Sequence, residues 1–244
     1  MAPRLAALAQ SSGIRWGLSS AEPMSGSQGH VDKPEPLIQA VGAVLAIGAI
    51  YLALPSDVVV GPTWLLPTLI VILLVPTIVS HRVKRHSINR ILGFIISGIT
   101  TLALIGSVAL LVLLLPTHRE SAAKLLGSGV LLWLTNVIVF ALWFWRVDGG
   151  GPIVRQQEKR FGSTSLLFPQ MALMPEERDY FGAAHWRPHF IDYLFHSFSQ
   201  CATFGPTDTP VLARWAKLVG MIETSISLTL IVLLISGAVG GLTA

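Results

Sequence analysis

Charged residues are scarce in this chain. Asp, Glu, Lys and Arg make up 12% of the 244 residues, about half of the ~25% that is typical of soluble domains. Long apolar runs replace them, since 52% of the residues are hydrophobic and the mean hydropathy is +0.65. This composition excludes an ordinary soluble domain and indicates an integral membrane protein whose first partner is the lipid bilayer.

Cysteine is almost absent as well. Cys201 is the only one, which excludes an internal disulfide and leaves the redox compartment open. The formal net charge of +4 would suggest nucleic acid in a soluble protein. Here the basic residues stand between apolar runs, where they set membrane orientation, so we expect no nucleic-acid partner.

Enzyme motifs are also missing. The sequence has no His-Glu-x-x-His, no Gly-x-Ser-x-Gly and no phosphate loop, and it has no aspartate pair suited to intramembrane proteolysis. Four residues are spaced for one helix face, but Pro188 interrupts that helix, so we expect their placement to be unrelated to a metal: His185, His189, Asp192 and His196. We therefore expect no catalytic residue, no metal and no cofactor.

What is present is a series of apolar segments. Residues 1–36 are polar and predict a disordered tail, in which Met24 is an alternative start. Residues 37–145 predict a four-helix transmembrane bundle, with Pro67 and Pro76 kinking the second helix. Its expected spans are residues 37–54, 64–80, 91–115 and 125–145. Residues 146–188 predict a polar or interfacial loop, with a flexible glycine-rich exit from the membrane.

Residues 189–244 hold a short aromatic segment, a turn and a long apolar helix. The segment 190–203 has 14 residues, or roughly 21 Å of helix, whereas a hydrocarbon core is about 30 Å thick. We therefore expect it to enter the membrane and turn back, with Thr209 and Pro210 beginning the last helix. The predicted fold is an all-α integral membrane protein with about five transmembrane helices and one re-entrant or half-spanning helix; six spans is the alternative.

Lysine and arginine alternate between the connecting segments. Residues 81–90 contain four and residues 146–189 contain six, whereas residues 55–63 contain none and residues 116–124 contain two. Cytoplasmic loops carry the positive excess. The pattern predicts a multi-pass protein of a bacterial inner (cell) membrane with a cytoplasmic N-terminus.

The turn carries a resemblance to ion channels. Residues 203–208, TFGPTD, resemble in degenerate form the Thr-Val-Gly-Tyr-Gly-Asp filter of potassium channels. Residues 193–202 stand where the pore helix would be, and MIE at 221–223 with the apolar run that follows resembles the inner helix. Thr207 stands in place of the second glycine and Pro206 in place of the tyrosine, which puts a filter of the same shape in doubt.

The resemblance implies a cation path and an assembly. It implies a monovalent cation as a candidate ligand and a homo-oligomer around the path, if the protein is a channel. The path residues would be Thr203, Gly205, Thr207 and Asp208, with Glu223 deeper in the membrane.

A second resemblance is more specific. WRVDGGGP at 145–152, LFPQM at 167–171, FGPTDT at 204–209 and RWAK at 214–217 are similar to segments of an uncharacterised family of bacterial integral membrane proteins. Its members usually carry Phe-Ser-Pro-Thr-Asp-Thr at the turn, and Gly205 occupies the serine position here. This resemblance covers about residues 140–242 and implies no established activity.

Each candidate residue has a structural alternative. Asp208 suits a pore mouth, and it equally suits a turn near a helix N-terminus. Glu223 suits ion binding or a proton relay, oriented by Thr224 and Ser227, or it pairs with a basic residue of a neighbouring helix or lies near the wet interface. The protein is therefore predicted either to conduct or transport a cation or to be a non-conducting scaffold or accessory subunit.

Overall fold

The computed structural model describes residues 38–83, 85–114, 121–157, 164–204 and 208–243. Within these ranges the ordered segments are helices, with one isolated antiparallel bridge between Leu166 and Val211. The predicted all-α class is confirmed. The predicted tail, Met24, Gly205 and Thr207 lie outside the described residues.

Three helices in the described part of the chain are long and apolar enough to cross a membrane. They cover Ser87–Leu114, Ala123–Gly150 and Arg214–Gly237. Two shorter apolar helices, Ile38–Ala53 and Leu65–Ser80, accompany them. Many large apolar side chains on these helices are exposed, for example Leu102 at 72% and Leu113 at 67%, as expected for surfaces that face lipid.

The first four apolar segments form helices close to their predicted bounds. They are α2 (Ile38–Ala53), α3 (Leu65–Arg82), α4 (His86–Leu114) and α5 (Ala122–Val147), and a short 3₁₀ turn, η1 (Ser56–Val58), follows α2. The loop predicted at 81–90 is largely helical, because α3 continues to Arg82 and α4 begins at His86. Hydropathy marks the apolar part of a helix, whereas the backbone hydrogen bonds continue into polar sequence.

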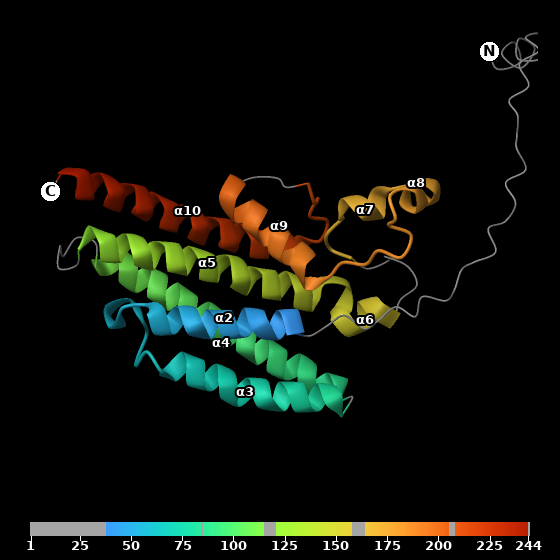
Figure 1. Cartoon of the computed structure of the whole chain (residues 1–244), viewed down its shortest axis with the longest axis horizontal. Helices are drawn as coiled ribbons and strands as arrows, with labels where there is room; N and C mark the ends of the chain where they lie inside the picture. Colours follow the sequence, from blue (N-terminus) through green and yellow to red (C-terminus); the bar gives the residue numbers. More distant parts are fainter. Residues whose placement is uncertain (1–37, 84, 115–120, 158–163, 205–207, 244) are drawn as a thin grey trace, which may run out of the picture. The chain divides into compact units, whose positions relative to one another are not determined.

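Helix α5 has neighbours on several sides. It packs against α2, α4, α9 and α10, and α3 packs against α2 and α4 (Figure 1). Polar contacts join the helices inside the apolar core, since Tyr51 Oη lies 3.3 Å from Ser107 Oγ and Trp143 Nε1 donates to Thr101 Oγ1 at 2.9 Å. Such bonds are needed where polar groups are buried among apolar side chains.

The segment after α5 is built into the fold, which differs from the flexible exit expected from its glycines. It contains η3 (Asp148–Gly150), α6 (Pro152–Gln157), α7 (Pro169–Ala172) and α8 (Pro175–Tyr180). Asp148 is fully buried and its carboxylate accepts hydrogen bonds from Tyr193 Oη, at 2.6 Å, and from the Ser165 backbone N–H. The glycines are needed because Gly149, Gly150 and Gly151 all have positive φ, which lets the chain fold tightly around Asp148.

The last two helices are α9 (Phe190–Thr203) and α10 (Arg214–Thr243). The bounds predicted for α9 are confirmed, but the predicted start of α10 at Thr209 and Pro210 is wrong. The chain at this point is paired with the segment after α6: Leu167 N–H donates to Pro210 O at 3.0 Å and Leu212 N–H to Ser165 O at 2.8 Å. These bonds hold it extended, so helix begins only at Arg214.

Candidate functional site

Helices α9 and α10 lie side by side and run in the same direction. Three contacts join them in matching order along both helices. Ser197 contacts Glu223, Gln200 Nε2 donates to Thr224 Oγ1 at 3.3 Å, and Ser227 Oγ donates to Cys201 O at 2.8 Å. Two consecutive helices can run parallel only if the chain returns between them.

The described part of that return lies beside α9. Thr209 and Pro210 line the same groove as His196 and Gln200, and Asp208 directly precedes them in the chain. The chain therefore leaves α9 at Phe204, whose φ of 53° is left-handed, and is back near the middle of α9 at Asp208. The chain thus reverses direction between α9 and α10, while the expectation that this reversal lies within the membrane stays a prediction.

A single carboxyl group is buried where α9 meets α10. Glu223 is fully buried, and its Oε1 is hydrogen-bonded to Ser197 Oγ and accepts from the Cys201 thiol at 3.3 Å. Ser197 Oγ also donates to the backbone oxygen of Val137 in α5, at 2.8 Å. Glu223 lies nine residues after the start of α10 at Arg214, or about 14 Å along the helix.

Neutral polar side chains surround this carboxyl group. Asn136 of α5 donates to Cys201 Sγ at 3.4 Å and to the Glu223 backbone oxygen at 3.1 Å. Trp133 Nε1 donates to Ser227 Oγ at 2.8 Å. The cluster therefore joins α5, α9 and α10 through hydrogen bonds in the core.

Two oxygens of the cluster have no hydrogen-bond partner within the described part of the chain. They are Glu223 Oε2 and Asn136 Oδ1, and both are buried. No basic side chain in the described ranges bonds to the Glu223 carboxyl group, whose contacts there are Ser197 and Cys201. The expected alternatives, a glutamate paired with a cation or wetted at the interface, do not describe this geometry.

The other predicted path residues lie away from this cluster. Thr203 is exposed and its hydroxyl donates to Ser199 O at 2.8 Å, while Asp208 is exposed and accepts from Thr209 Oγ1 at 3.2 Å. Neither residue bonds to Glu223. The predicted path residues Gly205 and Thr207 lie outside the described residues.

The residues that do bond to Glu223 were not found from the sequence. Thr224 and Ser227 were expected to orient it, but Thr224 bonds to Gln200, and Ser227 bonds to Trp133 and to Cys201 O. Ser197 and Cys201 take that place instead. One signal was available: Asn136 is a lone amide inside an apolar span, and such residues tend to mark sites.

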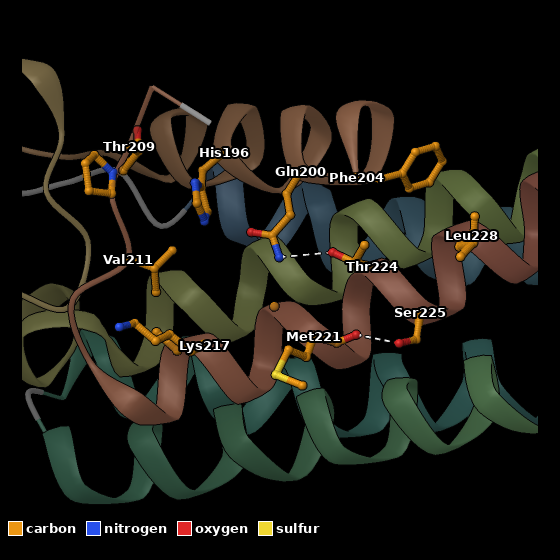
Figure 2. Close-up of a pocket in the computed structure, with 13 residues that line it drawn as sticks. His196, Gln200, Phe204, Thr209, Val211, Lys217, Met221, Thr224, Ser225 and Leu228 are labelled. Carbon is orange, nitrogen blue, oxygen red and sulfur yellow. Dashed lines mark hydrogen bonds between the residues drawn. The ribbon is translucent and has the colours of Figure 1, made fainter. Parts of the chain in front are cut away.

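A groove of about 610 Å³ opens between α9 and α10, beside the cluster (Figure 2). The amide of Gln200 points across it to Thr224, as Figure 2 shows. Phe204 and Leu228 lie at one end of it, Met221 lies near its middle, and His196 and Lys217 lie toward its other end. Glu223 itself does not line this groove.

The four residues spaced on one predicted helix face do not form a metal site. Asp192 accepts from the His189 backbone N–H at 2.7 Å and so caps α9, and the His196 ring packs edge-on against Phe144 at 5.0 Å. In the described ranges no group of three or more His, Cys, Asp or Glu residues is placed to hold a metal ion.

Fold and site together define a class, namely a helical membrane protein with a buried carboxyl group between a long apolar helix and a short one. Comparisons with protein-family models, with curated proteins and with solved structures give no match.

Proposed function

We propose that this protein binds a cation inside the membrane and conducts or transports it, with Glu223 as the residue that binds the ion. In this proposal α2, α3, α4, α5 and α10 cross the bilayer and α9 enters it and returns. One observation supports it above the others: the Glu223 carboxyl group is fully buried in an apolar helix and, among the described residues, has neutral partners only. An intramembrane carboxyl group is costly to bury and commonly marks an ion or proton site.

The turn after α9 supplies the entrance in this proposal. A non-helical backbone at membrane depth is tolerated where it is buried in protein or lines a water-filled cavity. Exposed Asp208 attracts the cation, since carboxylates at a pore mouth favour cations. Thr203, exposed at the end of α9, lines the path toward Glu223 in this proposal, and several copies around an axis would complete it.

The orientation follows from the positive charges. The end of α5, the start of α9 and the start of α10 are joined by the Asp148–Tyr193 bond and by Trp215 Nε1, which donates to Ser165 Oγ at 3.0 Å. These ends therefore lie at the same end of the helix bundle. Residues 146–189 contain six lysines and arginines, which supports a cytoplasmic location for that end and for the N-terminus.

Ion flux into proteoliposomes tests the proposal. We expect the purified protein to carry a monovalent cation or protons down a gradient, and Glu223→Gln to lower the rate by about tenfold or more because the binding group is lost. Asp208→Asn should lower it by only about two- to threefold, since a mouth charge concentrates ions without binding them. Glu176→Gln is the matched control because Glu176 is exposed on α8. No cation flux from folded wild-type protein, in any oligomeric form, would contradict the proposal.

A non-conducting scaffold or accessory subunit is the second candidate. The observation that favours it is the way residues 208–213 are held against the segment after α6, through the Leu166–Val211 bridge and the bonds of Ser165 to Leu212 and Trp215. A turn fixed in this way serves as a structural hairpin. Partner proteins that co-purify stoichiometrically, together with an absence of flux, would support this function.

A further inference from the structure

We infer that the ion bound at Glu223 is a proton, held between its carboxyl group and the Ser197 hydroxyl. The inference rests on the proposed function, because it names the ion bound at the same carboxyl group. It is argued from the number of hydrogens available in the buried cluster.

The Ser197 hydroxyl has one hydrogen but two oxygen partners. Its oxygen lies 2.8 Å from Val137 O and is also hydrogen-bonded to Glu223 Oε1. A backbone carbonyl can only accept, so Ser197 satisfies both contacts only if it donates to Val137 O and accepts from Glu223. Glu223 can donate only when its carboxyl group carries a proton.

The rest of the cluster supplies no substitute for that proton. The Cys201 thiol is a weak donor, and Asn136 spends both amide hydrogens on Cys201 Sγ and Glu223 O. An ionised Glu223 would thus have the Cys201 thiol as donor to Oε1, the Ser197 hydroxyl only if it gave up Val137 O, and no donor to Oε2 among the described residues. Burying a carboxylate with so little compensation is costly, whereas the neutral acid is cheap to bury.

The charged groups of α4 and α5 in the described ranges are too distant to stabilise an ionised form. Helix α2, which also packs on α9, contains no Asp, Glu, Lys, Arg or His. The α5 cations Lys124 and Arg146 lie 12 and 10 residues from Asn136, or roughly 18 and 15 Å along the helix. Helix α4 has its cations, His86 and Arg90, in its first two turns. Among the described residues, the titratable group bonded to Glu223 is the thiol of Cys201. His196 of α9 and Lys217 of α10 line the groove, whereas Glu223 does not.

A sodium or potassium ion fits this geometry poorly. Such an ion needs several oxygens to replace its hydration shell. The nearby backbone oxygens of Val137, Cys201 and Glu223 already accept from Ser197, Ser227 and Asn136. A proton needs only the two atoms between which it lies.

Infrared spectroscopy of the full-length protein in lipid tests the inference through the C=O stretch of a protonated carboxyl group. At neutral pH we expect wild type to show a deuterium-sensitive acid band that is absent from Glu223→Gln, retained in Glu176→Gln and unchanged by sodium or potassium chloride. Ser197→Ala should keep the band but shift it to higher frequency, because the hydrogen bond from the acid to Ser197 is lost.

Two infrared results would contradict the inference. If Glu223→Gln removes no acid band, or if sodium or potassium abolishes the band, the bound ion is not a proton. Far-ultraviolet circular dichroism confirms that each variant is folded, and Ser197→Ala, which keeps Glu223, covers the case in which Glu223→Gln does not fold. A lack of flux with the acid band intact would contradict the proposed function and leave this inference standing. Cation flux without the acid band would support the proposed function and contradict this inference.

Discussion

At the scale of single residues, two buried carboxyl groups show opposite environments. Both oxygens of Asp148 have a strong donor, from Tyr193 Oη and Ser165 N–H. Glu223 has an oxygen without a donor in the described part of the chain. A fully satisfied carboxylate stabilises a fold, whereas an incompletely satisfied one is unstable when charged. We therefore assign Asp148 a structural role and Glu223 the functional one.

The structural role of Asp148 gives a prediction. Tyr193→Phe removes the donor to Asp148 Oδ2 and keeps the ring, so we expect it to cost about 1–3 kcal/mol of stability. In a chain of this size the thermal midpoint should fall by roughly 2–4 °C for each kcal/mol. Tyr180→Phe is the control, since Tyr180 is 85% exposed. Equal midpoints for the two variants, measured by thermal unfolding in detergent, would show that the buried bond contributes nothing.

At the scale of elements, the packing of α10 depends on small residues at its contacts with α5 and α9. A Cβ atom built on Gly129 of α5 would lie 2.7 Å from Leu234 Cδ2, and one on Gly220 would collide with the Gln200 amide. These glycines let α10 approach both of its neighbours closely, as small residues do in other membrane helix pairs. The close approach also brings Asn136 and Ser197 within reach of Glu223.

The same helix offers a matched test of that packing. Gly129→Leu should cost about 1–3 kcal/mol, because the larger side chain has to displace Leu234 from the α5–α10 contact. Gly127→Leu, two residues earlier in α5, should be tolerated, since Gly127 is exposed and nothing lies within 4 Å of its would-be Cβ. Denaturant unfolding of both variants compares them. A Gly127→Leu variant as unstable as Gly129→Leu would rule out this explanation.

Sequence patterns predicted the elements better than the site. Apolar length and prolines sufficed for α2, α3, α5 and α9, because these signals are local. The start of α10 was misplaced because the bonds from Ser165 and Leu167 that hold the chain extended at Pro210 and Leu212 come from about 45 residues earlier. The Ser197–Val137 and Asn136–Glu223 bonds likewise join residues far apart in the sequence, and no spacing rule indicates such pairs.

At the scale of the whole molecule, the two ends of the helix bundle can be assigned from contacts. Tyr51 and Val60 lie against Ser107 and Gly106 near the carboxyl end of α4. The turn η1 is therefore at that end, while Asp148 and the starts of α9 and α10 are at the opposite end. Residues 55–63 contain no lysine or arginine and residues 116–124 contain two, whereas residues 146–189 contain six. This difference between the two ends supports the proposed orientation.

Cysteine labelling tests this orientation in cells. Asp57 and Glu176 are exposed at opposite ends of the bundle. The native Cys201 is fully buried, so its thiol should not react with a maleimide. We expect a membrane-impermeant maleimide to label Asp57→Cys in intact cells and Glu176→Cys only after the membrane is permeabilised. Reversed labelling would place the N-terminus outside. Labelling of Cys201 in the wild-type protein would contradict its burial.

The shared direction of α9 and α10 has an electrostatic consequence. Peptide dipoles add along a helix and leave about half a negative charge at its carboxyl end. In antiparallel neighbours such poles offset each other, but here the carboxyl pole of α9 lies partway along α10 with no opposite pole of α10 beside it. Its last carbonyl groups thus create a negative potential around Thr203, at the exposed end of α9 and about half a helical turn beyond Cys201. That potential disfavours a second negative charge nearby and attracts positive charge to this end of α9.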